Sequence, residues 1–190
     1  VSFRNWNTPS SRCLNLGFRV VMENGKQAEA ADASLPDAAQ VVQNLNRLGT
    51  AVKLDDRGNA VAVDFSRARL DGFDMSRLAA LPNVKSLKFF RQPIADADIQ
   101  TLWRLAKLKS LALDETKITD AGLAAVEKMA ALEELLLANT QIGDAGVEHL
   151  LRLPRLKRLR LSGTRLTDAG LTRLTEIETL QNLDISKTDI

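Results

Sequence analysis

The sequence predicts an α/β solenoid in which short parallel strands alternate with helices, closed at its N-terminal end by a helix and a hairpin. Three observations lead to this fold class. From Ala60 onward, a pattern of apolar residues recurs every 24 residues without a gap. Each repeat changes from strand-like to helical spacing, and a helix pattern and a hairpin pattern precede the first repeat. A fixed period of this kind is typical of solenoids, whose units bury their apolar stripes only against their neighbours.

The repeat occurs in six copies, the last of them incomplete. The copies begin at Ala60, Val84, Leu108, Leu132, Leu156 and Leu180. Positions 1, 4, 6 and 11 are apolar, and position 9 is Thr in four copies, so the pattern is L-x-x-L-x-L-x-x-T-x-I. This pattern resembles the leucine-rich repeat, which usually has Asn or Cys at the ninth position. We expect the hydroxyls at this position to bind backbone groups in the turn after each strand. They belong to Thr116, Thr140, Thr164 and Thr188.

The second half of each repeat has helical spacing. Leu123, Val126 and Met129 are three residues apart, and later repeats carry the same stripe, which predicts a helix of about ten residues. Thr-Asp-Ala-Gly precedes the stripe at 119–122 and 167–170, where Thr or Asp is expected to cap the helix and Gly to let neighbouring helices pack closely. The strands are then parallel with right-handed connections, concave on the strand side and convex on the helix side. The motif resembles the T-D-A-G-L type of bacterial leucine-rich-repeat proteins over residues 60–190, which implies a right-handed leucine-rich-repeat solenoid.

Residues 37–59 are expected to close the N-terminal end of the stack. Asp37 to Leu48 has an apolar helical face followed by Gly49, and strand-like segments at 52–54 and 60–65 flank a polar turn. At the other end, the sixth repeat stops at Ile190, which would leave an unprotected edge strand. A truncated chain explains this end, and an edge-to-edge dimer through the uncapped repeat is the alternative.

Residues 1–22 differ from the rest of the chain. Arg4, the turn Asn7-Thr8-Pro9 and the segment Asn15 to Arg19 resemble the closing segment of the formylglycine-generating enzyme (sulfatase-modifying factor) family. This resemblance implies a remnant of a C-type-lectin-like domain. The catalytic cysteine pair of that family belongs to a region upstream of this segment, and Cys13 matches neither nucleophile. Residues 23–36 are small and polar without a period, which predicts a linker.

Composition argues against several kinds of chemistry. The formal net charge is only +2, so no polyanionic partner is implied. The chain has one cysteine, Cys13, and one histidine, His149. They cannot form an intrachain disulfide or a zinc site, and nothing indicates a nucleophile beside a base. His149 is expected on the solvated side of a helix. We therefore expect no catalytic residue, no cofactor, no metal and no membrane segment; a cytoplasmic location fits the single cysteine. One aspartate per repeat is expected to cap a helix rather than to bind calcium. These residues are Asp96, Asp120, Asp144 and Asp168.

The strand positions between the apolar columns vary from repeat to repeat, as a recognition surface permits. The candidate residues of a concave binding face are Lys88, Phe90, Arg91, Asp114, Leu136, Asn139, Arg158 and Arg160. Exposed aromatic and arginine side chains tend to dominate interface energy, so a protein partner is expected there. Basic residues cluster at 152–165 and 85–109, but acidic residues lie between the clusters and no stacking platform accompanies them, so nucleic acid is not expected. Trp103 and Leu151 share one helix-side position, where partial burial between helices is expected and a second contact patch is the alternative.

The sequence therefore predicts a non-catalytic protein–protein interaction or scaffolding module of a larger modular bacterial protein. One alternative is the C-terminal part of a formylglycine-generating-type enzyme whose catalytic region lies upstream. Another is a sensor, signalling or defence protein with a degenerate lectin-like domain. The sequence that precedes Val1 in the gene would distinguish the three.

Overall fold

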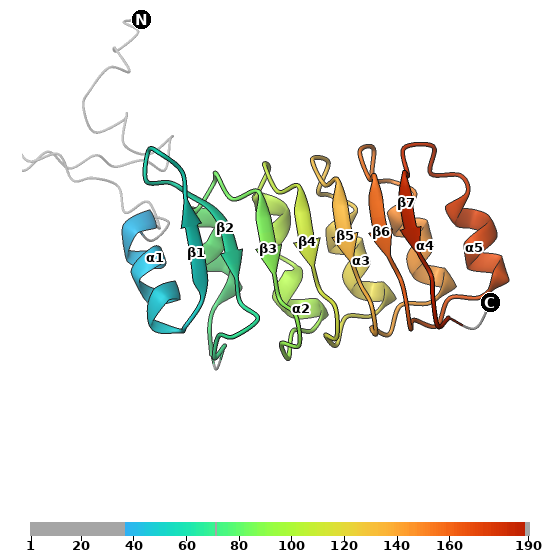
Figure 1. Ribbon diagram of the computed structural model, residues 1–190, viewed down its shortest axis with the longest axis horizontal. Helices are drawn as coiled ribbons and strands as arrows, with labels where there is room; N and C mark the ends of the chain where they lie inside the picture. The colour runs from blue at the N-terminus through green and yellow to red at the C-terminus, as the bar shows by residue number, and fades with distance from the viewer. Residues whose placement is uncertain (1–36, 71, 189–190) are drawn as a thin grey trace, which may run out of the picture. The chain divides into compact units, whose positions relative to one another are not determined.

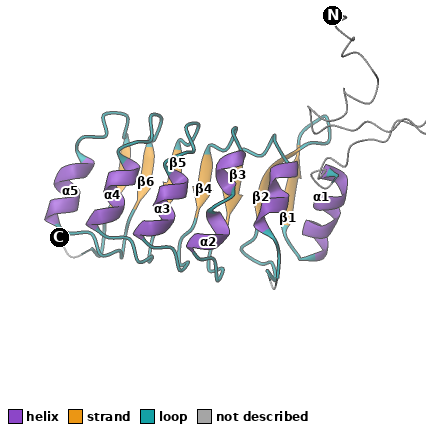
Figure 2. Cartoon of the chain, turned by 180° about the vertical axis from the view of Figure 1, so that it is seen from behind, coloured by secondary structure: helices purple, strands orange, loops and turns teal. Residues whose placement is uncertain are grey.

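The computed structural model describes residues 37–70 and 72–188. The predicted domain remnant at 1–22 and the predicted linker at 23–36 lie outside these residues. The described part of the chain forms one seven-stranded sheet whose strands follow one another in sequence order. The strands are β1 (Ala51–Leu54), β2 (Ala60–Asp64), β3 (Ser86–Lys88), β4 (Ser110–Ala112), β5 (Glu134–Leu136), β6 (Arg158–Arg160) and β7 (Asn182–Asp184). In Figure 1 these strands face the viewer, and in Figure 2 the helices lie in front of them.

The strands from β2 to β7 are parallel, and each pairs with the next in a register of one repeat. Leu87 lies beside Leu111, Leu111 beside Leu135, and Leu135 beside Leu159. Each residue therefore stands next to its counterpart 24 positions later, so a column of the aligned repeats becomes a row of neighbours across the sheet. The predicted parallel stack is confirmed.

Three regular helices cover one side of the sheet: α3 (Asp120–Val126), α4 (Asp144–Leu150) and α5 (Asp168–Leu174). Each has seven residues, so the prediction of about ten was too long. The third residue of each apolar stripe follows the helix in a tighter turn, as where the Met129 amide donates to the Val126 carbonyl at 2.9 Å. A spacing of three residues matches the three residues per turn of a 3-10 helix better than the 3.6 of an α-helix.

The first two repeats are less regular. Residues 75–80 form the 3-10 helix η1 (Met75–Ala80), and the second repeat has a single α-turn, α2 (Asp96–Ile99), followed by the 3-10 turn η2 (Leu102–Arg104). Neither repeat has the Asp-Ala-Gly sequence that begins the later helices. Ala95 stands at the N-cap of α2 and has no side-chain oxygen to accept a helix amide, which weakens the start of that helix.

A helix and a hairpin form the N-terminal end, as predicted. Helix α1 (Ala38–Arg47) begins at Asp37, whose carboxylate accepts a hydrogen bond from the Ala39 amide at 3.2 Å. It buries Val41 and Leu45 and is followed by Gly49, whose φ of +83° is the left-handed conformation that glycine favours after a helix. Strands β1 and β2 then pair antiparallel.

One continuous aliphatic core lies between the sheet and the helices. The leucines at position 4 from Leu87 to Leu159 are at most 1% exposed, and Phe65 and Phe89 stack at 4.6 Å between ring centroids. Burying one such leucine stabilises the fold by about 1.5–3 kcal/mol. The threonines at position 9 donate to the carbonyl three residues earlier, at 2.6–2.7 Å, which confirms their predicted role in the turn.

The aspartate column has a different role from the one predicted. Thr119 and Thr167 cap α3 and α5, whereas the aspartates reach across to the next repeat. Asp120 Oδ1 accepts from the Gly143 amide at 2.7 Å, and Asp144 Oδ1 accepts from the Thr167 amide at 2.9 Å. Each carboxylate therefore satisfies an amide at the start of the following helix, so the aspartates join repeats rather than cap their own helices.

The glycine of the Asp-Ala-Gly sequence shared by the last three helices makes room for this carboxylate. A Cβ atom at Gly146 would lie 2.5 Å from Asp120 Oδ1, so the close neighbour is an aspartate rather than a helix backbone. The second repeat is the exception, because the first has Gly72 at the aspartate position. There Asp98 replaces the glycine, and its own Oδ2 accepts from the Ala95 amide at 2.8 Å.

Candidate binding face

Side chains at positions 3, 5, 7 and 8 of the repeats lie on the side of the sheet away from the helices, which we call the strand face. Alternation along each strand produces this arrangement, because Leu87, Leu111 and Leu135 point into the core and their neighbours point outward. No helix covers this side in Figure 1. All eight candidate residues of the sequence analysis lie at these positions.

Ion pairs between consecutive repeats order the charged groups of the strand face and those of position 2, just before each strand. Glu133 binds Lys109 at 2.7 Å and Lys157 at 3.3 Å, and Glu134 binds Arg158 at 2.8 Å. Hydrogen bonds from the two lysines lower the pKa of Glu133. In the basic cluster at 152–165, acidic groups of other repeats therefore lie beside Arg152, Lys157, Arg158 and Arg160.

Asp114 is the exception among the candidates, because only 6% of it is exposed. Its Oδ1 accepts from the Ala138 amide at 2.7 Å, and Arg160 lies 3.7 Å from its Oδ2. The same guanidinium lies 3.5 Å from Asp184 Oδ2. Burial raises the pKa of Asp114, and the hydrogen bond from Ala138 and the charge of Arg160 only partly oppose this effect.

Phe90 and Arg91 form a preorganised pair at the edge of the strand face. Phe90 is 37% exposed, and the Arg91 guanidinium lies 4.8 Å from the centre of its ring. Glu115 holds that guanidinium at 2.8 Å. The backbone of Arg91 is left-handed, with φ of 58°, which turns the chain at the end of the strand.

The other candidates separate into two groups. Lys88 is exposed on β3 next to the Phe90 pair. Leu136 is half-buried on β5 and lies beside Arg160 in the register of the sheet. Asn139 is exposed in a left-handed turn, next to Gly163 of the following repeat. The structure thus brings Leu136, Arg158 and Arg160 together and places Lys88, Phe90 and Arg91 apart from them.

Two hollows open on the strand face. The first, of about 410 Å³, is the β5–β7 hollow, lined by Leu136, Arg158, Leu159, Arg160, Asn182, Leu183 and Asp184. The second, of about 310 Å³, is lined by the ion-paired Lys109, Glu133 and Lys157 together with Ser110, Glu134, Arg158, Gln181 and Asn182. They share Arg158 and Asn182, so the two hollows adjoin each other over the last strands of the sheet.

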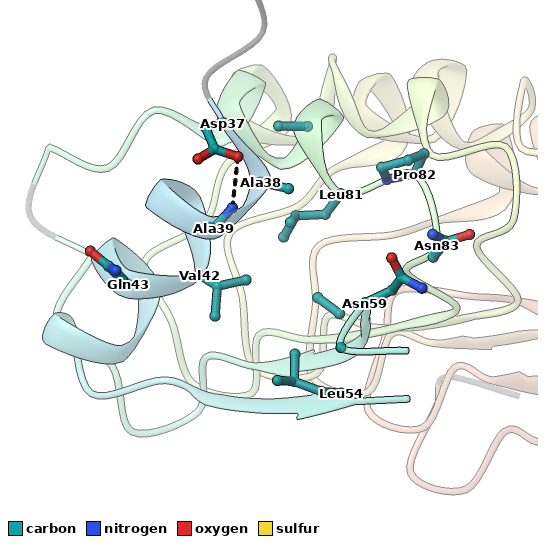
Figure 3. A pocket seen from close by; sticks show the side chains of 13 residues that line it. Asp37, Ala38, Ala39, Val42, Gln43, Leu54, Asn59, Leu81, Pro82 and Asn83 are labelled. Atoms are coloured by element: carbon teal, nitrogen blue, oxygen red, sulfur yellow. Dashed lines mark hydrogen bonds between the residues drawn. The ribbon is translucent and has the colours of Figure 1, made fainter. Parts of the chain in front are cut away.

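A further hollow of about 500 Å³ lies at the N-terminal end, where sequence reasoning expected no site. Figure 3 shows how Val42 of α1, Leu54 of the hairpin, and Leu81 and Pro82 after η1 surround it. Its lining is mostly apolar, with Asn59 among the polar groups. Three segments distant in sequence form this hollow, and no local motif marks it.

Trp103 and Leu151, which share one position on the helix side, differ in exposure. Trp103 is 45% exposed, but Leu151 is half-buried and Glu127 occupies the same position in the repeat between them. His149, expected to be solvated, is half-buried, and its Nδ1 lies 2.8 Å from Glu127 Oε2. Trp103 and Leu151 therefore do not form one apolar patch.

The described residues contain no group of three or more His, Cys, Asp or Glu side chains placed to hold a metal ion. Within the same residues, no helix has the length and apolar character needed to cross a membrane.

Comparisons with known proteins agree with this architecture. A family model described as "Leucine Rich repeat" matches residues 104–126 and 153–174. No curated protein matches the chain in sequence.

Solved structures provide the remaining comparison. An internalin from Listeria monocytogenes is 28% identical over 60% of this chain and 32% of its own, with a TM-score of 0.52. The leucine-rich-repeat ectodomain of the Arabidopsis receptor kinase HAESA is 20% identical over 82% of this chain and 30% of its own, with a TM-score of 0.57. The chain thus spans about a third of the length of these proteins. Together with the strand register and the 24-residue period, these matches identify the fold of the chain as a leucine-rich-repeat solenoid.

Proposed function

We propose that the chain is a non-catalytic interaction module whose strand face binds a protein or peptide. The observation that carries this proposal is the presence of apolar groups, Phe90 and Leu136, within a surface of ordered ion pairs. Aromatic and arginine side chains in well-packed positions tend to supply most of the binding energy at protein interfaces, and the residues around them exclude water.

Side chains of the strand face that are already ordered in the free chain favour binding by this face. Arg91 is held by Glu115 and Arg158 by Glu134 before any partner arrives. Fixing a long side chain on association costs about 0.5–1.5 kcal/mol, and a side chain that is already ordered avoids much of this cost. The strands that carry these residues are themselves held rigidly by their neighbours in the sheet.

Proteins of the same fold support this use of the architecture. The HAESA ectodomain was solved in complex with an extended IDA peptide hormone ligand, and HAESA was also solved with that hormone and the co-receptor SERK1. Both structures are about 20% identical to this chain, so they indicate what the fold accommodates and leave the partner of this chain to experiment.

Two exposed aromatic residues allow a matched test. Phe90→Glu on the strand face should abolish capture of the partner, whereas Trp103→Glu on the helix side, a change of the same kind at a similarly exposed residue, should preserve it. The partner is isolated with the wild-type chain, purified, and titrated by calorimetry against each variant. Loss of affinity with Trp103→Glu and none with Phe90→Glu would move the binding surface to the helix side.

Phe90 is a better position for this test than Arg158 or Arg160. Reversing the charge of Arg158 would place it against Glu134, its partner at 2.8 Å, and so disturb the fold as well as the surface. The enzyme and sensor alternatives depend on residues 1–22, outside the described residues. Pairing of a second copy along β7 also stays a prediction.

A further inference from the structure

The charges around the β5–β7 hollow do not balance. Glu134 and Arg158 form one pair at 2.8 Å, but Asp114 and Asp184 share the single guanidinium of Arg160. Neither carboxylate reaches hydrogen-bond distance of Arg160, since the separations are 3.7 Å and 3.5 Å. One negative charge is therefore left without a partner.

This imbalance is local. The charged groups that act on Asp114 are Arg160, which stabilises its carboxylate, and Glu115 and Asp184, which destabilise it. Glu115 is itself paired with Arg91. Hydrogen bonds from Ser186 and, more weakly, the charge of Arg160 lower the pKa of Asp184. The lysines of the adjoining hollow are held by Glu133 and are not among these groups.

The imbalance destabilises the free chain because one of the two carboxylates, Asp114, is buried. Its side chain is more than nine-tenths buried, its Oδ1 is engaged by the Ala138 amide, and its Oδ2 receives no hydrogen bond from any described residue. A desolvated carboxylate gains more from a nearby cation than an exposed one does. Asp184 is 47% exposed in its side chain and lines the hollow, so it is the accessible member of the pair.

We propose that the β5–β7 hollow receives a basic side chain, lysine or arginine, of the partner bound by the strand face. The incoming cation binds Asp184, and Arg160 is then free to close on Asp114 Oδ2. Leu136, at position 5 on the strand face, lines the same hollow and contacts the alkyl stem of the basic side chain. This inference rests on the proposed function and adds the chemistry of one partner residue to it.

Capped tripeptides test the proposal on the full chain. The probes are acetyl-Leu-Lys-Leu-amide and its norleucine analogue, which has a similar alkyl stem and no charge. The readouts are the backbone amide resonances of Ala138, which donates to Asp114, and Ser186, which donates to Asp184. We expect both to shift saturably with the lysine peptide and to respond to the norleucine peptide about tenfold more weakly.

Three variants show whether the two aspartates are responsible. Asp184→Asn and Asp114→Asn should each weaken the lysine response about tenfold, because either change removes the uncompensated charge. Glu115→Gln is the matched control: it removes a carboxylate next to Asp114 that Arg91 already neutralises, and it should leave the response unchanged. The amide spectrum of each variant reports whether it is folded, and Asn at 114 still offers an oxygen to the Ala138 amide.

Two results would overturn the cation site. One is an equal response to the norleucine peptide at these amides, which would leave the strand face as an apolar binding surface. The other is a lysine response that survives Asp184→Asn. Failure of the proposed function is separate, because it appears as partner binding that is insensitive to Phe90→Glu.

Discussion

Asp114 lies on the outer side of the sheet and is nevertheless buried. Phe90 and Ala138 stand at the same position of the two neighbouring repeats, and Arg160 reaches toward Asp114 from β6, with β5 between them. The result is a carboxylate that stays attached to the sheet through the Ala138 amide without a close counter-ion. The burial of this one carboxylate makes the stability of the chain depend on pH.

Burial raises the pKa of Asp114 above its ordinary value of 3.8, so the folded chain takes up a proton more readily than the unfolded chain. The contribution of Asp114 to stability is then lost as pH rises from that ordinary value through the raised one. We expect Asp114→Asn to unfold at a higher temperature than wild type at pH 7, and the difference to vanish below about pH 4. Thermal unfolding by circular dichroism at both pH values measures this. A variant less stable than wild type at pH 7 would show that Arg160 outweighs burial.

At the scale of the elements, each helix start is joined to the preceding repeat. The carboxylate of Asp120 accepts the Gly143 amide and occupies the space that a side chain at Gly146 would need. The aspartate of one repeat and the glycine of the next therefore belong together. The junction between the first and second repeats supports this interpretation, because both residues differ there: Gly72 stands at the aspartate position and Asp98 at the glycine position.

Gly146→Ala tests whether the Asp120 carboxylate requires the glycine. The new Cβ would lie 2.5 Å from Asp120 Oδ1 and 3.0 Å from Leu123 Cδ1, so the free energy of unfolding should fall by about 1–3 kcal/mol. Gly143→Ala is the matched control, since its nearest contact would be an ordinary 3.6 Å. Urea denaturation measures both variants. Equal losses in the two variants, or no loss with Gly146→Ala, would show that the Asp120 carboxylate does not require the glycine, because intrinsic helix propensity alone favours alanine at this position.

At the scale of the whole molecule, stability comes from stacking. Each repeat buries its leucines against the repeats on either side, so a leucine in the middle of the stack is fully enclosed. Leu135 is 0% exposed in β5, whereas Leu183, at the same position of the repeat in β7, is 37% exposed. Leu135 and Leu183 therefore contribute differently to the free energy of unfolding, although both lie at the same position of a strand.

Leu135→Ala should lower the free energy of unfolding by about 2–5 kcal/mol, the range for a fully buried leucine. Leu183→Ala should cost less than half as much, because part of its surface already contacts water. Denaturant unfolding with fitted midpoint and slope compares them. Similar losses at both positions would mean that strand propensity, rather than stacking, accounts for the leucine column.

The sequence by itself determined the period, the parallel register, the core columns and the helix and hairpin of the N-terminal end. It could do so because each repeat packs against a copy of itself, so that residues 24 positions apart become neighbours in space. Only the tertiary structure decided which side chains meet across that spacing. Glu133 and Glu134 neutralise Lys157 and Arg158, an aspartate expected to cap its own helix binds the next one, and Arg160 lies between Asp114 and Asp184. These contacts depend on the reach and direction of individual side chains across neighbouring strands, which the apolar period leaves free.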